Sequence, residues 1–413
     1  MKTSQTHLPS LLASILFALS ALFVLGTGLL LGFTAFFSWI SGQPVLTQQT
    51  ILFVAFAFEA VLLSAAAFFA FQKTLQKPAA DQPSFFRVSR GQVVIAVLVA
   101  AAAILIGYQI GALEPINWLV LPILTVPAIA LPLVVILALG SWKLPFGTRW
   151  QTWSVLGLGM TLAPLLLLIL EILIAVVLFF GGVAYVVAQP ELIFELQALS
   201  QQIMILGPES QEALDLLAPL LTRPGVMVVA LIYIAVLVPA IEELLKPLGV
   251  WLLAGRLDSA AQGFTLGALS GAAYGLIETI GVSGQAGDWA TLLFTRIGTG
   301  LLHITTSALM GAAILTAWRE RRYLYLVGTY FLAVLLHGLW NTCATLFSFS
   351  TLAELSNQPG RLSTIQPVIV TVMSLLAVIL FVTLVFSNRR MQKAVQPSVA
   401  ESPVSTRPID PIP

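Results

Sequence analysis

Long runs of apolar residues, separated by short polar segments, occupy most of this chain. Ten of the runs are long enough to cross a bilayer, since a helix needs about 20 apolar residues to span the hydrocarbon. Strands of membrane β-barrels are instead segments of roughly ten residues that alternate in polarity. The runs therefore predict α-helical spans, at residues 11–40, 49–72, 92–112, 117–140, 152–181, 226–254, 263–282, 289–317, 322–347 and 363–387.

The composition excludes a water-soluble protein and a disordered one. Of the 413 residues, 58% are hydrophobic and 9% are charged. Soluble domains carry about 25% charged residues, and disordered chains are polar and rich in charge. The net charge is only +1, so no basic excess indicates a nucleic-acid partner. We expect an all-α fold, a polytopic transmembrane helical bundle of about ten spans that is surrounded by the lipid bilayer.

The distribution of basic residues predicts the orientation of these spans, because lysine and arginine are enriched in cytoplasmic loops. If the N-terminus is cytoplasmic, ten spans return the C-terminus to the same side. In that orientation 15 of the 19 basic residues lie in the cytoplasm: Lys2, Lys73, Lys77, Arg87, Arg90, Lys143, Arg149, Arg256, Arg319, Arg321, Arg322, Arg389, Arg390, Lys393 and Arg407. Only Arg223 and Arg361 lie outside, and Lys246 and Arg296 lie within spans. We therefore expect both termini in the cytoplasm.

The spans and the segments between them divide the chain into five regions. Residues 1–181 form a five-span region of unknown role, 226–347 a four-span core, and 348–387 an outer loop with the tenth span. Residues 182–225 lie outside the cell and predict one or two amphipathic helices on the membrane surface, with a receptor-like cap as the alternative. Their acidic residues are Glu191, Glu195, Glu209, Glu212 and Asp215. The tail 388–413 contains five prolines, so we expect it to be disordered.

Ionisable side chains inside membrane spans are costly, and each is by default a candidate for function. The spans contain nine of them: Glu59, Glu171, Glu242, Glu243, Lys246, Glu278, Arg296, His303 and His337. Glu59 and Glu171 stand alone in the first five spans, and we interpret them as structural groups. Arg296 is also interpreted as a structural residue, or as one whose side chain extends toward the membrane–water interface. The remaining six all lie in spans six to nine.

Five of these six side chains, all but Lys246, also share one depth in the membrane. Each of the five lies about 14–16 residues from the start of its span, which is roughly 21–26 Å at the helical rise of 1.5 Å per residue. Four consecutive helices thus bring polar groups to the middle of the bilayer, where each would cost several kcal/mol if unpaired. We expect the groups to face one another across a small polar cavity.

Spacing along the helices supports this cavity. Glu242 and Glu243 precede Lys246 by four and three residues, so the lysine can reach either carboxylate. A buried ion pair that fixes helix register is the alternative, although it leaves the second carboxylate unexplained. His337 and Asn341 are four residues apart and share a face. Span seven carries a glycine every four residues, which allows a neighbouring backbone to approach closely: Gly263, Gly267, Gly271 and Gly275.

Four motifs in this region resemble those of the PrsW family of intramembrane proteases, a group related to the CAAX prenyl endopeptidases and bacteriocin-processing enzymes. They are EELLKP at 242–247, GAAYGLIE at 271–278, HITTSALMG at 303–311 and HGLWN at 337–341. The family pattern has EExxK, then FxxxE, then two histidine motifs on successive spans. This chain has Tyr274 where the family usually has phenylalanine, which we expect to matter little. The resemblance covers about residues 226–345.

The resemblance implies hydrolysis of a peptide bond in a membrane-associated protein, such as an anti-sigma factor or another signalling protein, at a bacterial plasma membrane. Such hydrolysis requires an activated water, a donor to the oxyanion and a proton for the leaving amine. The implied catalytic residues are Glu242 or Glu243 for the water, shared with Glu278 or His303, and His337 with Asn341 for the oxyanion. Lys246 would support them by keeping one glutamate ionised.

A zinc ion is the alternative means of activating the water. Two histidines and a glutamate form a known catalytic ligand set, and Glu243, His303 and His337 would supply it here. The sequence has no HExxH helix, and the Lys246 ammonium within one turn of both glutamates would repel a dication in a low-dielectric site. Asn341 suits an oxyanion better than zinc. We therefore expect that no cofactor is required.

Two other classes of function are compatible with the pattern. Carboxylates and histidines at the membrane midplane also build proton relays, which would indicate a proton-coupled secondary transporter. The halves of the chain show no inverted repeat, however, and the ionisable groups cluster in one half. A non-catalytic membrane scaffold of the same superfamily is the third class, which the presence of all four motifs disfavours.

Overall fold

The computed structural model describes residues 7–84, 88–111, 113–207, 210–283, 289–355 and 364–395. Within these ranges the regular structure is helical apart from one isolated bridge between Pro83 and Thr148, which confirms the predicted all-α fold. Five residues that entered the sequence predictions lie outside the described ranges, and so does the tail beyond Val395: Lys2, Arg87, Glu209, Arg361 and Arg407.

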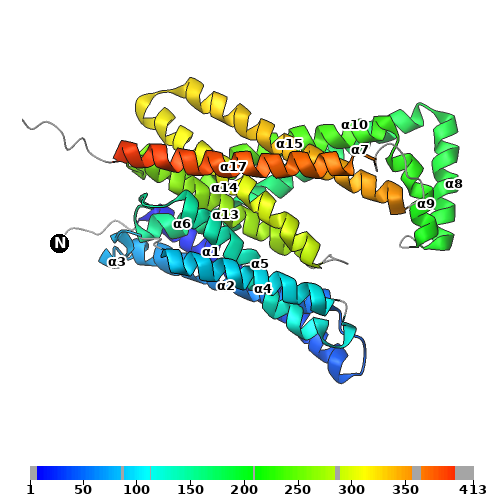
Figure 1. The fold of residues 1–413 in the computed structure, drawn as a ribbon, viewed down its shortest axis with the longest axis horizontal. Coiled ribbons are helices and arrows are strands. Elements are labelled where there is room, and N and C mark those ends of the chain that lie inside the picture. The colour runs from blue at the N-terminus through cyan, green and yellow to red at the C-terminus, as the bar shows by residue number, and fades with distance from the viewer. Residues whose placement is uncertain are drawn as a thin grey trace, which may run out of the picture.

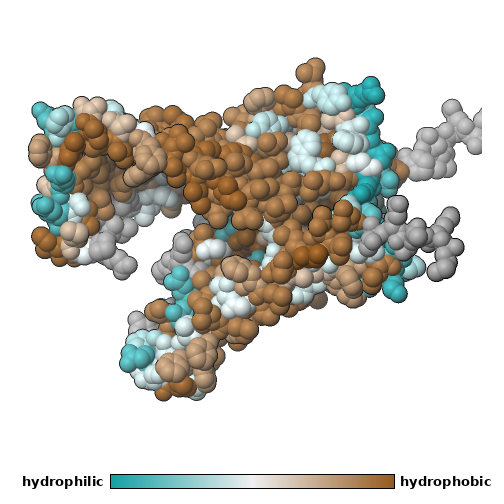
Figure 2. Space-filling model, turned by 180° about the vertical axis from the view of Figure 1, so that it is seen from behind, coloured by the Kyte–Doolittle hydropathy of each residue, from teal (hydrophilic) through white to brown (hydrophobic). Residues whose placement is uncertain are grey.

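Two helical hairpins form the N-terminal part of the molecule. Helices α1 (Leu8–Ile40) and α2 (Thr47–Thr74) pack together, and so do α4 (Arg90–Gly111) and α5 (Glu114–Gly140), with the short α3 (Pro78–Asp81) between the pairs. These helices and the later helices α7 (Leu162–Val187), α10 (Pro224–Ile232), α15 (Tyr323–Leu355) and α17 (Gln366–Val395) form two arms. The arms diverge toward the end where α8 (Pro190–Leu206) and α9 (Gln211–Leu221) lie (Figure 1). The surface of both arms is apolar along most of their length, and polar residues gather near the ends (Figure 2).

The fifth predicted span consists of two helices rather than one. Helix α6 (Arg149–Met160) ends at Thr161, and α7 (Leu162–Val187) follows. The break arises because Pro164 has no N–H to donate to the carbonyl of Met160 four residues earlier. The Thr161 hydroxyl instead donates to the Gly157 carbonyl at 2.7 Å. Helix α7 also extends six residues into the segment that the sequence assigned to the outer surface.

Two helices follow α7 at the far end of the molecule. Helices α8 (Pro190–Leu206) and α9 (Gln211–Leu221) run across the direction of the long helices and lie away from the main bundle (Figure 1). The sequence predicts one or two helices in this segment, and the structure has two. Arg223 pairs with Glu195 and ties the segment that follows α9 to α8. The arrangement suits helices that rest on a membrane surface.

The sixth predicted span is interrupted where it approaches α15 (Tyr323–Leu355). Helix α10 (Pro224–Ile232) leads into a π-helix, η1 (Tyr233–Leu237), before α11 (Val238–Leu245). Pro239 cannot donate to the Ala235 carbonyl, and that carbonyl is packed so close to Gly338 that an added Cβ would lie 2.2 Å from it. Asn341 Nδ2 donates to the Ile234 carbonyl at 3.0 Å. Turns of π-helix are rare and often mark functional sites.

A second break follows the charged motif. Pro247 ends α11 because it lacks an N–H for the Glu243 carbonyl, and α12 (Leu248–Leu253) and the 3₁₀ turn η2 (Ala254–Arg256) complete the span. The Lys246 carbonyl accepts a hydrogen bond from the Ser270 hydroxyl of α13. Lys246 is therefore held at a helix break, where both its backbone and its side chain are fixed by other elements.

The centre of the bundle is an antiparallel pair, α13 (Ala260–Ser283) and α14 (Trp289–Glu320). Cβ atoms built on Gly263, Gly267 and Gly271 would lie 2.1–2.4 Å from carbonyl oxygens of α14, so only glycine permits this approach. At Gly275 the nearest atom would lie 3.4 Å away. The predicted glycine ladder thus brings the backbones into direct contact at three of its four positions.

Nine helical segments of the described chain have the length and apolar character of membrane spans. They correspond to nine of the ten predicted spans, and α13 is the tenth. Its 24 residues extend about 36 Å alongside α14, which is one of the nine. The start of α1 and the end of α17 (Gln366–Val395) lie at the same end of the molecule (Figure 1), which requires an even number of crossings. Helix α17 also continues eight residues into the segment expected to be disordered.

The segments predicted to be cytoplasmic meet at this one end. Gln151 Nε2 donates to the Arg256 carbonyl at 2.8 Å, and Asn388 Nδ2 donates to the Gly140 carbonyl at 2.7 Å. The guanidinium of Arg319 contacts the Leu257 carbonyl. Contacts among four connecting segments indicate that the spans alternate in direction as the sequence predicts.

Candidate active site

The polar residues of four helices converge inside the bundle. Helix α11 contributes Glu242 and Glu243, with Lys246 at its C-terminal boundary; α13 contributes Glu278, α14 contributes His303 and α15 contributes His337. All of these side chains except Glu278 are buried, and Lys246 and Glu243 are completely inaccessible. The spacing along the chain had placed these residues at one depth, and the structure brings them into direct contact.

Lys246 lies at the centre of the cluster. Its Nζ atom is 2.8 Å from Glu242 Oε2, 2.9 Å from Glu243 Oε1 and 2.8 Å from His303 Nδ1. His337 Nδ1 is 3.2 Å away. A buried ammonium is costly unless it is paired and hydrogen-bonded, and the two carboxylates of α11 together with His303 of α14 meet this requirement. The lysine therefore reaches both carboxylates, where the sequence had left open which one it would pair with.

The two glutamates differ in the hydrogen bonds that their carboxylates accept. Glu243 Oε1 accepts hydrogen bonds from Lys246 and from His337 Nδ1, the latter at 2.8 Å. Glu242 Oε2 lies within ion-pair distance of Lys246, but the direction does not suit a hydrogen bond, and the atom has no hydrogen-bond partner among the described residues. Glu243 Oε2 likewise has no hydrogen-bond partner among the described residues. The two residues differ because Glu243 is completely buried and its Oε1 accepts two hydrogen bonds, whereas Glu242 is 6% exposed.

These contacts determine the tautomers of both histidines. A carboxylate only accepts, so His337 Nδ1 carries the hydrogen that it gives to Glu243, which in a neutral imidazole leaves the lone pair on Nε2. That Nε2 lies 3.7 Å from Glu242 Oε2. His303 Nδ1 accepts from Lys246, so Nε2 of His303 carries a hydrogen and donates to Glu278 Oε2 at 2.7 Å. Because its Nδ1 accepts from Lys246, the His303 imidazole is neutral in this arrangement.

Glu278 lies at the edge of the cluster. Its Oε2 atom also pairs with Arg296 Nη2 at 2.7 Å, and Arg296 Nε donates to the Thr279 hydroxyl at 3.3 Å. The side chain of Glu278 is 34% exposed, the highest value in the cluster. Arg296 therefore balances the charge of Glu278 from within the membrane and has a partner there, in agreement with a structural role.

Asn341 does not contact Lys246 or the glutamates. One hydrogen of its amide is used by the Ile234 carbonyl of the π-helix. The sequence pattern suggested that this amide would face the same cavity as His337. The π-helix explains the difference, because its free carbonyl competes for the amide and no feature of the spacing signals that turn.

Tyr274 is part of the cluster although the sequence did not single it out as a site residue. Its ring centroid lies 5.0 Å from Lys246 Nζ and 5.2 Å from the His303 ring, to which it is nearly perpendicular. The side chain is 8% exposed, so the ring closes one side of the site.

Comparison with protein families agrees with this geometry. A family described as PrsW family intramembrane metalloproteases matches residues 148–384, more than half of the chain. The chain belongs to the PrsW family. The match extends from α6 into α17, so it includes α6 to α9, which the four motifs alone did not indicate. No curated protein and no solved structure matches the chain.

Membership in the PrsW family makes this protein an intramembrane peptidase, and its setting is the lipid bilayer with a membrane-embedded protein as substrate. The family description also raises the question of a metal. Glu242, His303 and His337 offer ligand atoms within 4.8 Å of one another, a set that could hold a metal ion. Glu242 takes the place that the sequence assigned to Glu243.

The space between these ligand atoms is occupied by Lys246. Acceptors arranged tetrahedrally about an ammonium at about 2.9 Å would be roughly 4.7 Å apart, whereas ligands about zinc at about 2.1 Å would be roughly 3.4 Å apart. Lys246 Nζ is 2.8 Å from Glu242 and from His303. The donor types suit a metal, but in this arrangement an ammonium fills the position that the metal would need.

Glu171 lies closer to the site than the sequence indicated. It is half-buried on α7, whose surrounding residues are exposed, and α7 packs against α11, the helix that carries Glu242. The Tyr233 hydroxyl donates to its backbone carbonyl at 3.2 Å. Glu59, the other isolated glutamate, is buried on α2. Only the tertiary structure distinguishes these two residues.

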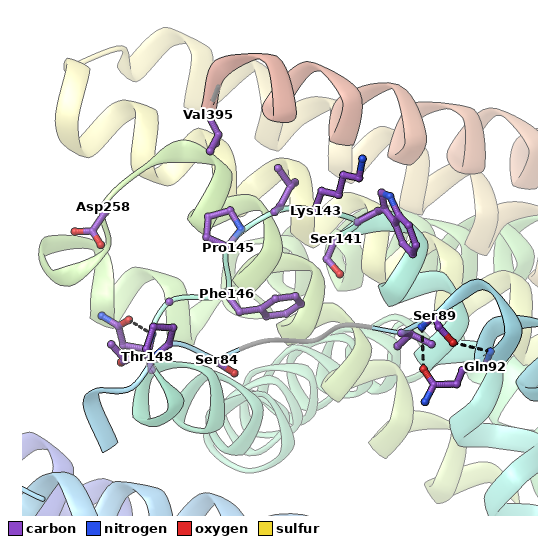
Figure 3. Close-up of a pocket in the computed structure, with 16 residues that line it drawn as sticks. Ser84, Ser89, Gln92, Ser141, Lys143, Pro145, Phe146, Thr148, Asp258 and Val395 are labelled. Carbon is purple, nitrogen blue, oxygen red and sulfur yellow. Dashed lines mark hydrogen bonds between the residues drawn. The ribbon is translucent and has the colours of Figure 1, made fainter. Parts of the chain in front are cut away.

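A cavity of about 870 Å³ lies elsewhere, at the end where the predicted cytoplasmic segments meet. Figure 3 shows its lining, in which Ser141, Lys143 and Pro145 lie across from Ser84 and Ser89, with Val395 of α17 at one edge. No residue of the Glu–His cluster lines this cavity. The chemistry described above therefore belongs to the interior of the bundle and not to this opening.

Proposed function

We propose that this protein hydrolyses a peptide bond in a membrane-associated protein and that Glu242 activates the water. The observation that carries the proposal is the difference between the two adjacent glutamates. Glu243 is completely buried and accepts from both Lys246 and His337. Glu242 is 6% exposed and therefore the more accessible of the two, and its Oε2, like that of Glu243, has no hydrogen bond among the described residues. A water bound there would face a carboxylate that is free to take its proton.

The chemical step follows from this assignment. Glu242 takes a proton from the water while the hydroxide oxygen forms a bond to the carbonyl carbon of the substrate. The carbonyl oxygen becomes an oxyanion, and the positive charge of Lys246 next to it lowers the energy of that charge. The carbon–nitrogen bond then breaks, and the leaving amine takes the proton from Glu242. The products are a carboxylic acid and an amine, and the glutamate is regenerated.

Two further groups support the step. His337 Nε2 has a lone pair 3.7 Å from Glu242 Oε2, so a water between them would have two acceptors to orient it. Asn341 retains a second amide hydrogen beside the one given to Ile234. The oxyanion role suggested for Asn341 rests on that hydrogen. His303 contacts Lys246 through Nδ1 and is itself held by Glu278 through Nε2.

We propose that no metal is required, because Lys246 supplies the positive charge at the position that a metal would occupy. Elemental analysis of active, purified protein tests this point. We expect less than stoichiometric zinc and full activity after chelation. Stoichiometric zinc, with activity lost on chelation and restored by zinc, would contradict it and would make Glu242, His303 and His337 the ligands.

The substrate would reach the cluster from the side of Glu278. Figure 2 shows a recess between the two arms with polar surface at its base, and Glu278 is the most exposed carboxylate of the cluster. A photo-crosslinking residue at Glu171 on α7 should capture a bound substrate. One at Phe23, which is 76% exposed on α1, serves as the control in the membrane-facing part of the other arm. Capture at Phe23 alone would refute this route.

The central experiment compares Glu242→Gln with Glu59→Gln in purified protein supplied with membrane-spanning peptides. We expect Glu242→Gln to abolish cleavage without lowering Tm, and Glu59→Gln, which changes a buried glutamate of α2, to leave the rate unchanged. Wild-type turnover by Glu242→Gln would show that Glu242 does not activate the water. Proton-coupled uptake into proteoliposomes, lost in the same variant, would favour the transporter.

We also propose that the natural substrate is a membrane-associated signalling protein such as an anti-sigma factor, and that the chain resides in a bacterial plasma membrane. The basis is the resemblance of the four motifs. Proteomic comparison of cells that carry the wild type and the Glu242→Gln variant tests it. The substrate should accumulate uncut in the variant, and an unchanged set of membrane-protein fragments would argue against the assignment.

A further inference from the structure

Arg296 of α14 is the second cation of the cluster, and the proposed reaction gives it no task. Its Nη2 atom lies 2.7 Å from Glu278 Oε2, and its Nε donates to the Thr279 hydroxyl at 3.3 Å. The Thr279 hydroxyl donates its own hydrogen to the Gly275 carbonyl at 2.7 Å, which leaves its oxygen to accept from Arg296. Adjacent residues of α13 therefore hold the guanidinium at two points.

Glu278 is the carboxylate that needs such an anchor. Its side chain is 34% exposed, more than any other carboxylate of the cluster. One atom, Oε2, both pairs with Arg296 and accepts from His303 Nε2 at 2.7 Å. A glutamate at the open edge of the cluster is otherwise free to turn away from the histidine, because its side chain has several rotamers. The ion pair with a guanidinium that is itself fixed on Thr279 keeps Oε2 directed toward His303.

His303 transmits the position of this oxygen to Lys246. A carboxylate that accepts from one imidazole nitrogen fixes the orientation of the ring and raises the basicity of the other nitrogen. Here Nε2 donates to Glu278, and Nδ1 accepts from Lys246 Nζ at 2.8 Å. If Glu278 turned away, the buried Nε2–H would lose its acceptor, and the ring could rotate and take Nδ1 away from the ammonium. Lys246 would then lose one of the contacts that hold it beside Glu242 and Glu243.

We propose that Arg296 is a positioning residue, which acts through Glu278 and His303 to hold Lys246 in place for the cleavage step. The effect on the rate rests on the proposed function, in which Lys246 stabilises the oxyanion. The hydrogen bond between His303 and Glu278 does not depend on that function and can be measured separately. Arg296 thus has a role in the reaction in addition to the structural one that its position in a span indicates.

Three variants of Arg296 test this role by their rates. Arg296→Gln removes the charge and should lower kcat by roughly ten- to a hundredfold, the usual effect of losing a hydrogen bond to a charged group. Arg296→Lys keeps the charge but not the planar guanidinium that reaches Glu278 and Thr279 together, so it should lower kcat less. KM should not change, because the effect is exerted on Lys246. Guanidinium added to Arg296→Ala should restore part of kcat, whereas urea, which has a similar shape and no charge, should not.

A nuclear magnetic resonance signal separates positioning from a general structural effect. The chain has three histidines, and the Nε2–H signal of His303 is identified by its absence from His303→Gln. An imidazole N–H that is bound to a carboxylate resonates at low field. In Arg296→Gln it should move to higher field and exchange faster with water. The matched control is Arg223→Gln, which breaks the ion pair with Glu195 of α8 and should leave both the signal and kcat unchanged.

The possible outcomes distinguish the positioning role from the proposed function. If Arg296→Gln keeps the wild-type kcat, or loses activity with an unchanged His303 signal, Arg296 does not act through this histidine, and an inactive Glu242→Gln would leave the proposed function standing. If Arg296→Gln has a lower Tm, Arg296→Lys decides, since wild-type kcat and signal in that variant would refute the need for the guanidinium. Wild-type turnover by Glu242→Gln would refute the proposed function, whereas a shifted His303 signal in Arg296→Gln would still support the positioning of this histidine.

Discussion

Gly271 holds α13 against α14 at the residue that carries a histidine of the site. A Cβ atom at Gly271 would lie 2.1 Å from the His303 carbonyl oxygen and 2.6 Å from its carbonyl carbon. Real Cβ atoms essentially never come within 3.0 Å of such atoms, so Gly271→Ala must separate the helices by at least 0.9 Å, the difference between 3.0 and 2.1 Å. The atoms in the way are backbone and cannot rotate aside.

The expected loss of activity follows from this displacement. His303 Nε2 is 2.7 Å from Glu278 Oε2, and Nδ1 is 2.8 Å from Lys246 Nζ, so a shift of 0.9 Å takes one or both beyond hydrogen-bonding distance. A displacement of about 1 Å in a catalytic arrangement can cost about 100-fold in rate. Overpacking of this kind typically destabilises by about 1–3 kcal/mol. We therefore expect Gly271→Ala to cleave about a hundredfold more slowly and to have a lower Tm.

Gly275→Ala, one turn further along α13, is the matched control. A Cβ at Gly275 would meet the His303 ring at 3.4 Å and Gly300 at 3.7 Å, which are ordinary contacts. This variant should keep nearly the wild-type rate and Tm. Rates are measured on a membrane-spanning peptide and Tm in the same detergent. Equal rates for Gly271→Ala and the wild type, or equal losses in the two variants, would show that helix contact at His303 does not control the site.

Two further predictions follow from the same structure. Lys246→Met should abolish cleavage and lower the free energy of unfolding by about 3–5 kcal/mol, because it leaves the carboxylate of Glu243 buried without its cation; an active variant of wild-type Tm would contradict the central role of this lysine. Reporter fusions should place the two termini in the cytoplasm and α8 and α9 outside: fusions after residues 80 and 320 should be active only inside and one after residue 205 only outside, and any reversal would exclude the ten-span orientation.

The sequence alone was sufficient for the architecture because the bilayer imposes strict demands on it. A span must be long and apolar, and a charge within it is costly without a partner. These two requirements predicted all ten helical segments. They also placed Glu242, Glu243, Glu278, His303 and His337 at one level, where the structure brings them together. The glycine period in span seven likewise predicted the close approach of α13 to a neighbour.

The tertiary structure determined which contacts and hydrogen bonds each of these side chains makes. It placed Lys246 between both carboxylates, left Glu242 the more accessible of the two glutamates and directed one hydrogen of Asn341 to the π-helix. It also brought Tyr274 and Glu171 to the site. Spacing along a helix fixes which residues share a face, but it does not fix how the helices rotate and cross. Contacts near 3 Å depend on that rotation and on breaks such as those at Pro239 and Pro247, which act only through the packed bundle.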